Sequence, residues 1–294
     1  MNTKVLPTTH DPSIISFGTC LNIARRGNKL NILLIALTRP SVKNAFHSIL
    51  YQDLIHLLYL TTDDSSIDAI VLTGTGLYFS SGADINSSFQ EHETKSQETN
   101  HSSMQFMMEI LKYPKILCAA VNGPALGIAV TLLFHCDLCY CVHDATFWIP
   151  FTRLALVPEF ASSFTLVESM GLSKANELLL LGKKIDSKTA KDMNLCSTIL
   201  SMSDLSECID RLDPFTRHNI GDYMIQELDS YLFHLPYASG TSKLFTEMIR
   251  GRRRRLLEQV CQQEMNILQD RITKGEVKNA LTVLMMNRTR TSKL

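Results

Sequence analysis

Apolar runs separated by turn-forming residues predict alternating strands and helices in the first part of the chain. Residues 30–37 are apolar and are followed by Arg39-Pro40, a pattern typical of a buried strand stopped by proline. A helix is expected to begin at a capping Ser41, because apolar residues then recur at helical spacing as far as Leu58. Residues 67–73 form the next predicted strand, and this order of elements is a βα unit that feeds a parallel sheet.

The middle of the chain alternates between polar and strongly apolar segments. Residues 86–103 are polar and predict a mobile surface segment before a helix with methionines on one face. Residues 116–134 are apolar and about long enough, at roughly twenty residues, to span a bilayer. Asn122, Gly123 and Pro124 interrupt that run. We therefore expect a strand, a tight turn and a buried helix, and no membrane span.

Strand patterns give way to helical ones toward the end of the chain. Residues 138–142 and 146–148 are two further short apolar segments with strand character. From Ser162 onward the apolar spacing is helical, with longer helices expected after Thr216 and Gly240. The predicted organisation is an N-terminal segment with a possible edge strand (1–29), an α/β core (30–200) and a helical C-terminal region (201–294).

The composition indicates a globular protein without a strong electrostatic field. The chain has 294 residues, of which 45% are hydrophobic and 20% charged. Its 29 basic and 29 acidic residues cancel, so it lacks the positive field that gathers nucleic acid. The basic run at residues 250–255 is interpreted as the solvated face of a helix.

The eight cysteines have no disulfide or zinc spacing and are expected to be small buried side chains in a reducing compartment. The histidines likewise show no spacing for a metal or a catalytic triad, so no metal site is predicted. The first twelve residues lack the basic and apolar regions of a secretory signal. Nothing in the pattern therefore indicates export.

Two glycine-centred turns carry the candidate chemistry. Each follows an apolar strand, and such a turn can leave backbone N–H groups aimed into a cleft. The second turn also precedes a helix, whose N-terminus favours negative charge. Each turn alone is explained as well by the geometry of a tight turn. The two segments are Ser81-Gly82-Ala83-Asp84-Ile85 and Asn122-Gly123-Pro124-Ala125-Leu126-Gly127-Ile128.

Taken together and in this order, the two turns resemble those of the crotonase superfamily of enoyl-CoA hydratases and isomerases. The resemblance runs from about Leu30 to the C-terminus, and it is most similar to the peroxisomal Δ3,Δ2-enoyl-CoA isomerases. It implies an α/β fold with the spiral ββα core of crotonases, which is similar to that of ClpP, and a helical C-terminal region. The further segments that carry it are Cys136-Asp137-Leu138, Ala145-Thr146-Phe147, residues 151–159, Gly182-Lys183-Lys184-Ile185 and Asn266-Ile267-Leu268-Gln269.

The resemblance also implies roles for individual residues. The backbone N–H groups of Ala83 and Ile128 correspond to the oxyanion hole, and Glu159 to the catalytic base of the isomerases. Water addition needs two acid–base groups, whereas moving a double bond needs one. The two acidic positions of the hydratases are occupied by Thr131 and Phe151, which favours isomerisation. The implied substrate-binding residues are Ser81, Gly82, Ala83, Asp84, Ile85, Gly127 and Ile128.

The surroundings of Glu159 support this role independently. The apolar residues 154–164 would remove water from its carboxylate and move its pKa toward the working pH. Relatives commonly have a small residue after the glutamate, and the bulky Phe160 could reshape the acyl pocket or displace the carboxylate. A surface glutamate near a helix start remains the alternative when the residues are considered without the resemblance.

The predicted activity is a Δ3,Δ2-enoyl-CoA isomerase of β-oxidation that needs no cofactor, because coenzyme A belongs to the substrate. A hydratase or dienoyl-CoA isomerase, and a non-catalytic acyl-CoA-binding protein, are the alternatives. The resemblance implies a homotrimer, and a basic C-terminal side chain near the coenzyme A phosphate. Ser292-Lys293-Leu294 is the sequence read by the peroxisomal import receptor, which predicts the peroxisome matrix as the location.

Overall fold

The computed structural model describes residues 6–7, 13–29, 31–84, 93–201, 220–233 and 238–291. Ile85 of the first turn and the tripeptide Ser292-Lys293-Leu294 lie outside the described residues, as do residues 86–92 of the polar segment. The α/β architecture predicted from the sequence is confirmed, with a mixed sheet and a long helical C-terminal region.

The main sheet has seven strands in the order β1-β2-β3-β4-β5-β7-β10. The first three strands pair antiparallel, and every later pair is parallel. Parallel neighbours need crossover connections, which the helices provide. The strands are β1 (Ile15–Phe17), β2 (Leu21–Arg26), β3 (Ile32–Leu37), β4 (Ala69–Gly74), β5 (Ile116–Val121), β7 (Leu138–Val142) and β10 (Thr198–Leu200).

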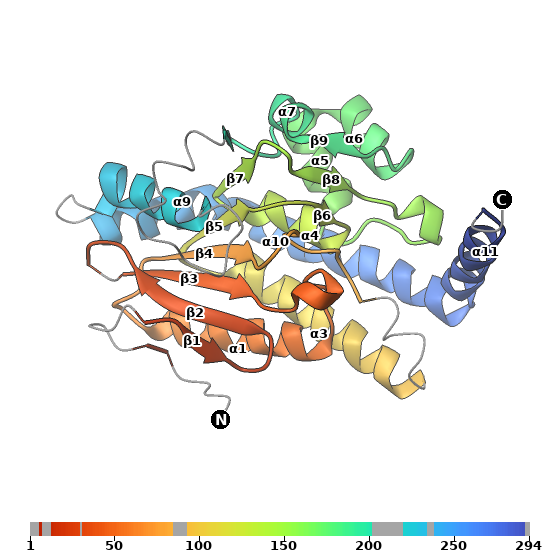
Figure 1. Cartoon of the computed structure of the whole chain (residues 1–294), viewed down its shortest axis with the longest axis horizontal. Helices are drawn as coiled ribbons and strands as arrows, with labels where there is room; N and C mark the ends of the chain where they lie inside the picture. Colours follow the sequence, from red (N-terminus) through yellow and green to blue (C-terminus); the bar gives the residue numbers. More distant parts are fainter. Residues whose placement is uncertain are drawn as a thin grey trace.

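Helices cover both faces of this sheet. Helices α1 (Ser48–Asp63) and α3 (Glu93–Lys112) pack against each other along one face, and α9 (Ile220–Leu228) lies across β4, β5 and β7 (Figure 1). Ile35 of β3 shares an apolar lining with side chains of α1 and α3, whereas its neighbour Leu34 approaches Gly221 of α9. This alternation buries both faces, as is usual for parallel sheets.

A second, three-stranded sheet and a group of short helices follow the turn after β5. The strand order of this sheet is β6-β8-β9, and the chain continues after β8 to Glu159, the candidate base. The elements are β6 (Ala125–Leu126), α4 (Ile128–Thr131), η2 (Leu132–His135), β8 (Thr146–Trp148), η3 (Thr152–Leu154), α5 (Ser162–Met170), α6 (Leu172–Leu179), β9 (Ile185–Asp186) and α7 (Ser187–Asp192).

The C-terminal region is built around one long helix. Helix α10 (Ala238–Thr273) contacts α3, α5 and β5 and leads to α11 (Glu276–Thr291), which lies at one end of the molecule and contacts η3 (Figure 1). A short π-helical turn, η5 (Asp229–Phe233), connects to α9. Among the described helices, none combines the length and apolar character that a membrane span requires.

Two boundaries differ from the sequence-based predictions. Ser41 does not cap the first helix, because residues 40–42 form a separate 3₁₀ turn, η1 (Pro40–Val42), and Lys43 and Asn44 adopt positive φ. His47 caps α1 instead, through a hydrogen bond from Leu50 N to its Nδ1 atom (3.3 Å).

The expectation of an irregular segment at residues 86–103 was wrong for residues 93–103, which belong to α3. Once the apolar turns of α3 are packed, extending the helix fixes one residue for each added hydrogen bond. Ser102 and Ser103 are themselves buried, so the polar sequence concealed part of the packed face.

The arginine run also differs from the predicted solvated face. Arg250 donates to Lys115 O and pairs with Asp137 (3.1 Å), and Arg253 pairs with Glu168 (2.5 Å). Arg252 and Arg255 are exposed, as predicted. The run therefore alternates between side chains that attach α10 to the core and side chains that face solvent.

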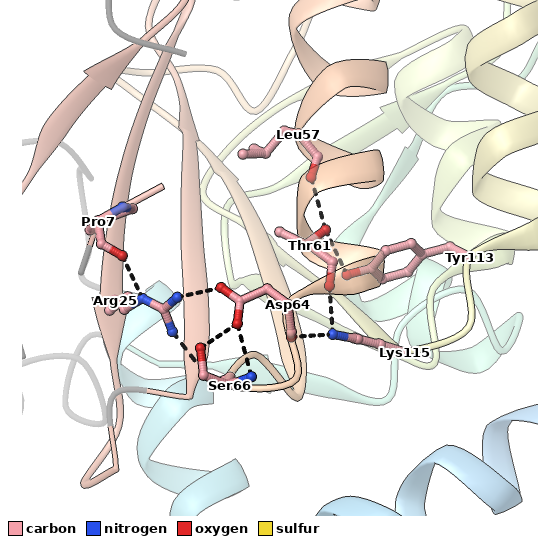
Figure 2. Close-up of polar contacts among 8 residues, drawn as sticks. All are labelled: Pro7, Arg25, Leu57, Thr61, Asp64, Ser66, Tyr113 and Lys115. Atoms are coloured by element: carbon pink, nitrogen blue, oxygen red, sulfur yellow. Dashed lines mark hydrogen bonds and ion pairs between the residues drawn. The ribbon is translucent and has the colours of Figure 1, made fainter. Parts of the chain in front are cut away.

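A buried polar network lies where β4 and β5 begin (Figure 2). Arg25 is 2% exposed, and it donates to Pro7 O (2.8 Å) and Asp64 Oδ2 (2.6 Å). Lys115 donates to the carbonyl oxygens of Thr61 (2.5 Å) and Asp64 (2.6 Å), which satisfies the last turn of α1. Burial alone would raise the pKa of Asp64, but hydrogen bonds from Ser66 and Arg25 outweigh it and lower that pKa.

All seven described cysteines are free thiols. Six are buried and Cys136 is partly buried, so they act as small apolar side chains, as the sequence predicted. Cys141 and Cys196 approach each other, with their sulfur atoms 3.3 Å apart.

Candidate active site

The two glycine-centred turns lie side by side at the carboxyl ends of β4 and β5. Ser80 forms a parallel bridge with Ala125, and Leu126 N donates to Ser80 O (3.0 Å). Phe79 N and Ser80 N both donate to Pro124 O (3.1 and 3.3 Å). These bonds place the segment after β4 and the segment after β5 in one layer.

Gly82 allows the two turns to approach closely. A Cβ atom built on Gly82 would lie 2.5 Å from Leu126 O, which is too short for any side chain. Gly82 also has φ +80°, a conformation that favours glycine. The sequence motif thus has a steric cause, since only glycine fits against the second turn.

Two backbone N–H groups at these turns remain available. Phe46 N donates to Gly82 O (2.8 Å) and Asp84 N donates to Phe46 O (2.7 Å), so the N–H of Ala83 points away from Phe46. Ile128 is the first residue of α4, where an N–H has no partner within the helix. Among the described residues, neither N–H group has a hydrogen-bond acceptor.

The other polar side chains of the first turn are held by the scaffold. Asp84 pairs with Arg39 (3.3 Å), which in turn donates to Ala45 O (2.6 Å). Ser81 N donates to Lys43 O (2.9 Å). These contacts fix the backbone around the exposed Ala83 and leave its N–H accessible.

Glu159 stands on the loop between η3 and α5. Its carbonyl oxygen accepts a hydrogen bond from Ser162 N (3.1 Å), which shapes the loop as a turn. The side chain is partly buried. Loss of water raises the pKa of Glu159 to about 8, and the charge of Glu264 contributes in the same direction. A carboxyl group with such a pKa can both take and return a proton near neutral pH.

Phe160 lies in the core. The residue is fully buried, and its ring stacks on His135 (4.3 Å between centroids) and meets Phe106 edge to face (6.1 Å). Its φ of +62° lies in the left-handed region, which large side chains rarely adopt. The aromatic packing holds this side chain in a backbone conformation that favours glycine, and the ring fixes the loop that carries Glu159.

A chain of aromatic rings connects the base loop to the first turn. Phe106 contacts Phe160 and also Phe46 (6.0 Å), whose backbone bonds to the turn at Gly82. Tyr51 packs on Phe46 (5.4 Å), and the charge of Glu159 adds to the burial that raises the pKa of Tyr51. Packed aromatic side chains thus lie between the loop of Glu159 and the segment that bonds to the first turn.

The two positions that are acidic in hydratases carry no acid–base group. Thr131 is fully buried, and its hydroxyl donates to Ile128 O (3.2 Å). Phe151 is 3% exposed, and its ring lies 3.8 Å from where a Cβ on Gly127 would be. Neither side chain can deprotonate a water molecule.

Sequence reasoning missed Glu264, a second carboxylate near Glu159. Glu264 is 6% exposed and belongs to the buried stripe of α10, together with Cys261, Met265 and Leu268. The signal was present, because a charged residue occupies a position of that stripe where the helical spacing expects an apolar side chain. It was hidden by the polar residues around it in sequence.

Comparison with protein families places most of this chain in one of them. Residues 27–213 match the enoyl-CoA hydratase/isomerase family. A crystal structure of an enoyl-CoA hydratase/isomerase from Pseudoalteromonas atlantica T6c superposes with a TM-score of 0.77 at 26% identity, covering 92% of this chain and 98% of the other.

Two curated relatives are similar in sequence. Enoyl-CoA delta isomerase 2 of Rattus norvegicus is 34% identical over 251 residues, which are 84% of this chain and 59% of the relative. Enoyl-CoA delta isomerase 3, peroxisomal, of Mus musculus is 36% identical over 173 residues, 58% of this chain and 54% of the relative. The chain therefore spans less than two thirds of the length of either relative.

Proposed function

The chain belongs to the enoyl-CoA hydratase/isomerase family, and we propose that within it the protein is a Δ3,Δ2-enoyl-CoA isomerase. The reaction would move the double bond of a 3-enoyl-CoA to give the 2-trans-enoyl-CoA, a step in the β-oxidation of unsaturated fatty acids. The observation that carries this proposal is the desolvated carboxyl group of Glu159, with Thr131 and Phe151 at the positions that the resemblance identifies as acidic in hydratases.

In the proposed mechanism the thioester carbonyl accepts hydrogen bonds from the N–H groups of Ala83 and Ile128. These donors stabilise the negative charge that develops on the carbonyl oxygen when Glu159 removes a proton from C2. The electron pair of the broken C–H bond forms the new C2=C3 bond, and the former double bond takes a proton at C4. Glu159 returns that proton, so the enzyme ends unchanged and no redox cofactor is required.

The pKa of Glu159 suits both halves of this cycle. A base with a pKa near 8 is ionised in roughly a tenth of the molecules at pH 7 and in half of them at pH 8. It is also a stronger base than an exposed glutamate, which helps it to remove a carbon-bound proton. The protonated form lies in apolar surroundings, where it is retained until transfer to C4.

The test is a turnover assay with 3-enoyl-CoA on the wild type and on Glu159→Gln, which keeps the shape of the side chain and removes the base. We expect isomerisation to fall by about a hundred- to ten-thousand-fold while acyl-CoA binding, measured by calorimetry, stays unchanged. Glu177→Gln removes an exposed glutamate that pairs with Lys183 and should leave turnover unchanged.

Three outcomes would contradict the proposal. Retained isomerisation in Glu159→Gln would remove the base from the mechanism. Equal binding and no turnover in both proteins would identify a non-catalytic acyl-CoA-binding protein. Water addition to 2-enoyl-CoA at a rate comparable to isomerisation would identify a hydratase that uses a second acid.

We further propose that the protein works in the peroxisome matrix. The proposal is supported by Ser292-Lys293-Leu294, which forms the import address if Leu294 is the carboxyl terminus of the mature chain. The mouse relative is named as peroxisomal. Deletion of Leu294 from a fluorescent fusion with a free carboxyl end should change a punctate signal to a diffuse one. Punctate fluorescence after the deletion would show that another signal directs import.

A homotrimer is the proposed assembly. Helix α10 exposes a group of large apolar side chains, each at least 59% accessible, that association would cover: Leu244, Phe245, Met248 and Ile249. Analytical ultracentrifugation should give three times the mass of 33.1 kDa. A monomer across micromolar concentrations would contradict this part of the proposal.

A further inference from the structure

Glu264 makes a contact that joins the C-terminal helix to the loop of Glu159. One carboxylate oxygen, Oε1, accepts a hydrogen bond from Ser163 N (2.9 Å) at the start of α5. The other oxygen, Oε2, is buried and has no hydrogen-bond partner among the described residues. Burying a carboxylate with only one hydrogen-bonded oxygen costs free energy. Its presence in the fold therefore needs an explanation.

The contact supplies a cap that α5 lacks locally. The residue before the helix is Ala161, which has no side-chain oxygen to accept the free N–H groups of the first turn. Glu264 provides that acceptor from α10, 101 residues away in sequence. Since Ser162 N donates to Glu159 O in the same turn, the cap fixes the segment that carries the base.

We propose that Glu264 is a positioning residue for Glu159: its carboxylate anchors the base loop through the first turn of α5 and keeps a negative charge beside the base. The proposal rests on the proposed isomerase function for its catalytic consequence. Its structural part, the attachment of the first turn of α5 to the carboxylate of Glu264 on α10, does not depend on the substrate.

The two carboxyl groups differ in their partners, and this separates their titrations. Burial raises the pKa of Glu264, but hydrogen bonds from the first turn of α5 oppose that rise. No hydrogen bond from the described residues lowers the pKa of Glu159 in this way. Glu159 therefore keeps its proton to higher pH. Glu264 ionises first, and its charge then disfavours a second charge on Glu159.

Other titratable groups near the base come from several elements. Tyr51 of α1 and Cys261 of α10 are buried, and both have raised pKa values, so they remain neutral near pH 7. Burial lowers the pKa of His135 to about 4, which keeps that ring neutral as it donates to Phe160 O (2.7 Å). Arg271 of α10 donates to Ala155 O (2.8 Å), and its charge is paired with Glu276 (2.6 Å).

The experiment titrates Glu159 directly in the full chain without substrate. Infrared difference spectra between wild type and Glu159→Gln isolate the carboxyl band of Glu159, and its intensity is followed from pH 5 to pH 10. The wild-type midpoint is expected near pH 8. In Glu264→Gln, whose amide oxygen still accepts from Ser163 N, the midpoint should fall by roughly one pH unit. The matched control Glu258→Gln removes a charge elsewhere on α10 and should not shift it.

A second variant covers the case in which Glu264→Gln does not fold. Glu264→Asp keeps the charge and shortens the side chain, which withdraws the carboxylate from Ser163. We expect a smaller fall of the midpoint and a lower turnover, with the circular dichroism of the wild type. An unchanged midpoint in a folded Glu264 variant overturns the proposal.

Kinetics separate this inference from the proposed function. If the wild type isomerises 3-enoyl-CoA, the acidic limb of kcat/KM in Glu264→Gln should move to lower pH with the infrared midpoint. A merely structural effect would lower the rate equally at every pH. If the midpoint shifts but no 3-enoyl-CoA turns over, the carboxyl pairing stands and the isomerase assignment fails. If turnover is normal and neither measurement shifts, the assignment stands and the pairing fails.

Discussion

Two partly buried acidic groups, Asp64 before the start of β4 and Glu159 in the candidate active site, behave in opposite ways. Asp64 is bonded to Arg25 and Ser66, and its pKa is lowered (Figure 2). Glu159 lies near another carboxylate, and its pKa is raised to about 8. The same fold therefore keeps one carboxyl group ionised and leaves another able to exchange its proton near neutral pH.

The difference lies both in the loss of water, which is greater at Glu159, and in the partners of the two carboxyl groups. Asp64 contacts a cation and hydrogen-bond donors, which favour its charged form. Burial removes water from the carboxyl group of Glu159, and the like charge of Glu264 adds to this effect, so both favour its neutral form. A carboxyl group with full partners stabilises the fold, whereas one without them is ready to move a proton.

Next to removal of the base itself, the largest effect is expected from removing a backbone hydrogen-bond donor in the candidate active site. Ala83→Pro deletes the backbone N–H, and loss of one donor of this kind lowers turnover by about a hundred- to a thousand-fold. Ala83→Gly keeps the N–H and should be mild. Turnover of 3-enoyl-CoA together with thermal melting distinguishes chemistry from misfolding. Full activity in a folded Ala83→Pro protein would refute the assignment of this N–H.

Removing the carboxylate of Asp64 should lower the free energy of unfolding and leave turnover unchanged. Asp64→Asn removes a charged partner of the buried guanidinium of Arg25, which should cost roughly 2–3 kcal/mol of stability. Urea denaturation measures this loss, and kcat at a temperature where the variant is folded should equal that of the wild type. A large fall in kcat would mean that Asp64 and the candidate active site are coupled through the sheet.

The pH dependence of turnover should follow the carboxyl group of raised pKa. Glu159 acts as a base only when it is ionised, so kcat/KM should rise with pH and level off above about pH 8. Below that point the rate should fall about tenfold for each pH unit. A profile that is flat from pH 6 to pH 9 would contradict a base with this pKa.

The smallest expected effect is a gain in stability when the base is removed. Because the pKa of Glu159 is higher in the folded chain than its usual value of 4.5, the folded state holds the proton more tightly, and stability falls as pH rises from about 4.5 to 8. Glu159→Gln should therefore be more stable than the wild type by roughly 1–2 kcal/mol at pH 9, a value reduced for partial exposure. Urea denaturation at pH 4 should show no difference, and a variant that is less stable at pH 9 would show that the carboxylate is not destabilising there.

Much of the fold follows from local patterns in the sequence. The strand at residues 116–121 and the turn at Asn122-Gly123-Pro124 were predicted because apolar runs and turn residues act over short distances. Ser41 misled the prediction of the first helix, since the positive φ at Lys43 and Asn44 depends on how the chain meets the first turn. Local propensity contains no information about that contact.

The site was predictable where it depends on turns and not where it depends on distant contacts. Gly82 and Gly127 predict two tight turns, and the order of these turns along the chain carries the family resemblance. Glu264 could not be assigned to the site, because its contact with Ser163 spans the whole C-terminal region and needs α10 to dock on α5. The sequence likewise did not reveal that the ring of Phe160 would pack into the core.

The rate at which a thiol reagent modifies the buried cysteines can be used to measure how often α10 detaches from the core. Cys261 is fully buried one turn before Glu264, with its sulfur 3.8 Å from that of Met107 on α3, while Cys118 lies in the centre of the sheet. A thiol reagent reaches either residue only when the structure around it opens. Faster alkylation of Cys261 than of Cys118, resolved by peptide mass spectrometry, would report detachment of the helix while the sheet stays closed. Equal rates would show that the base loop, its anchoring helix and the sheet open as one cooperative unit.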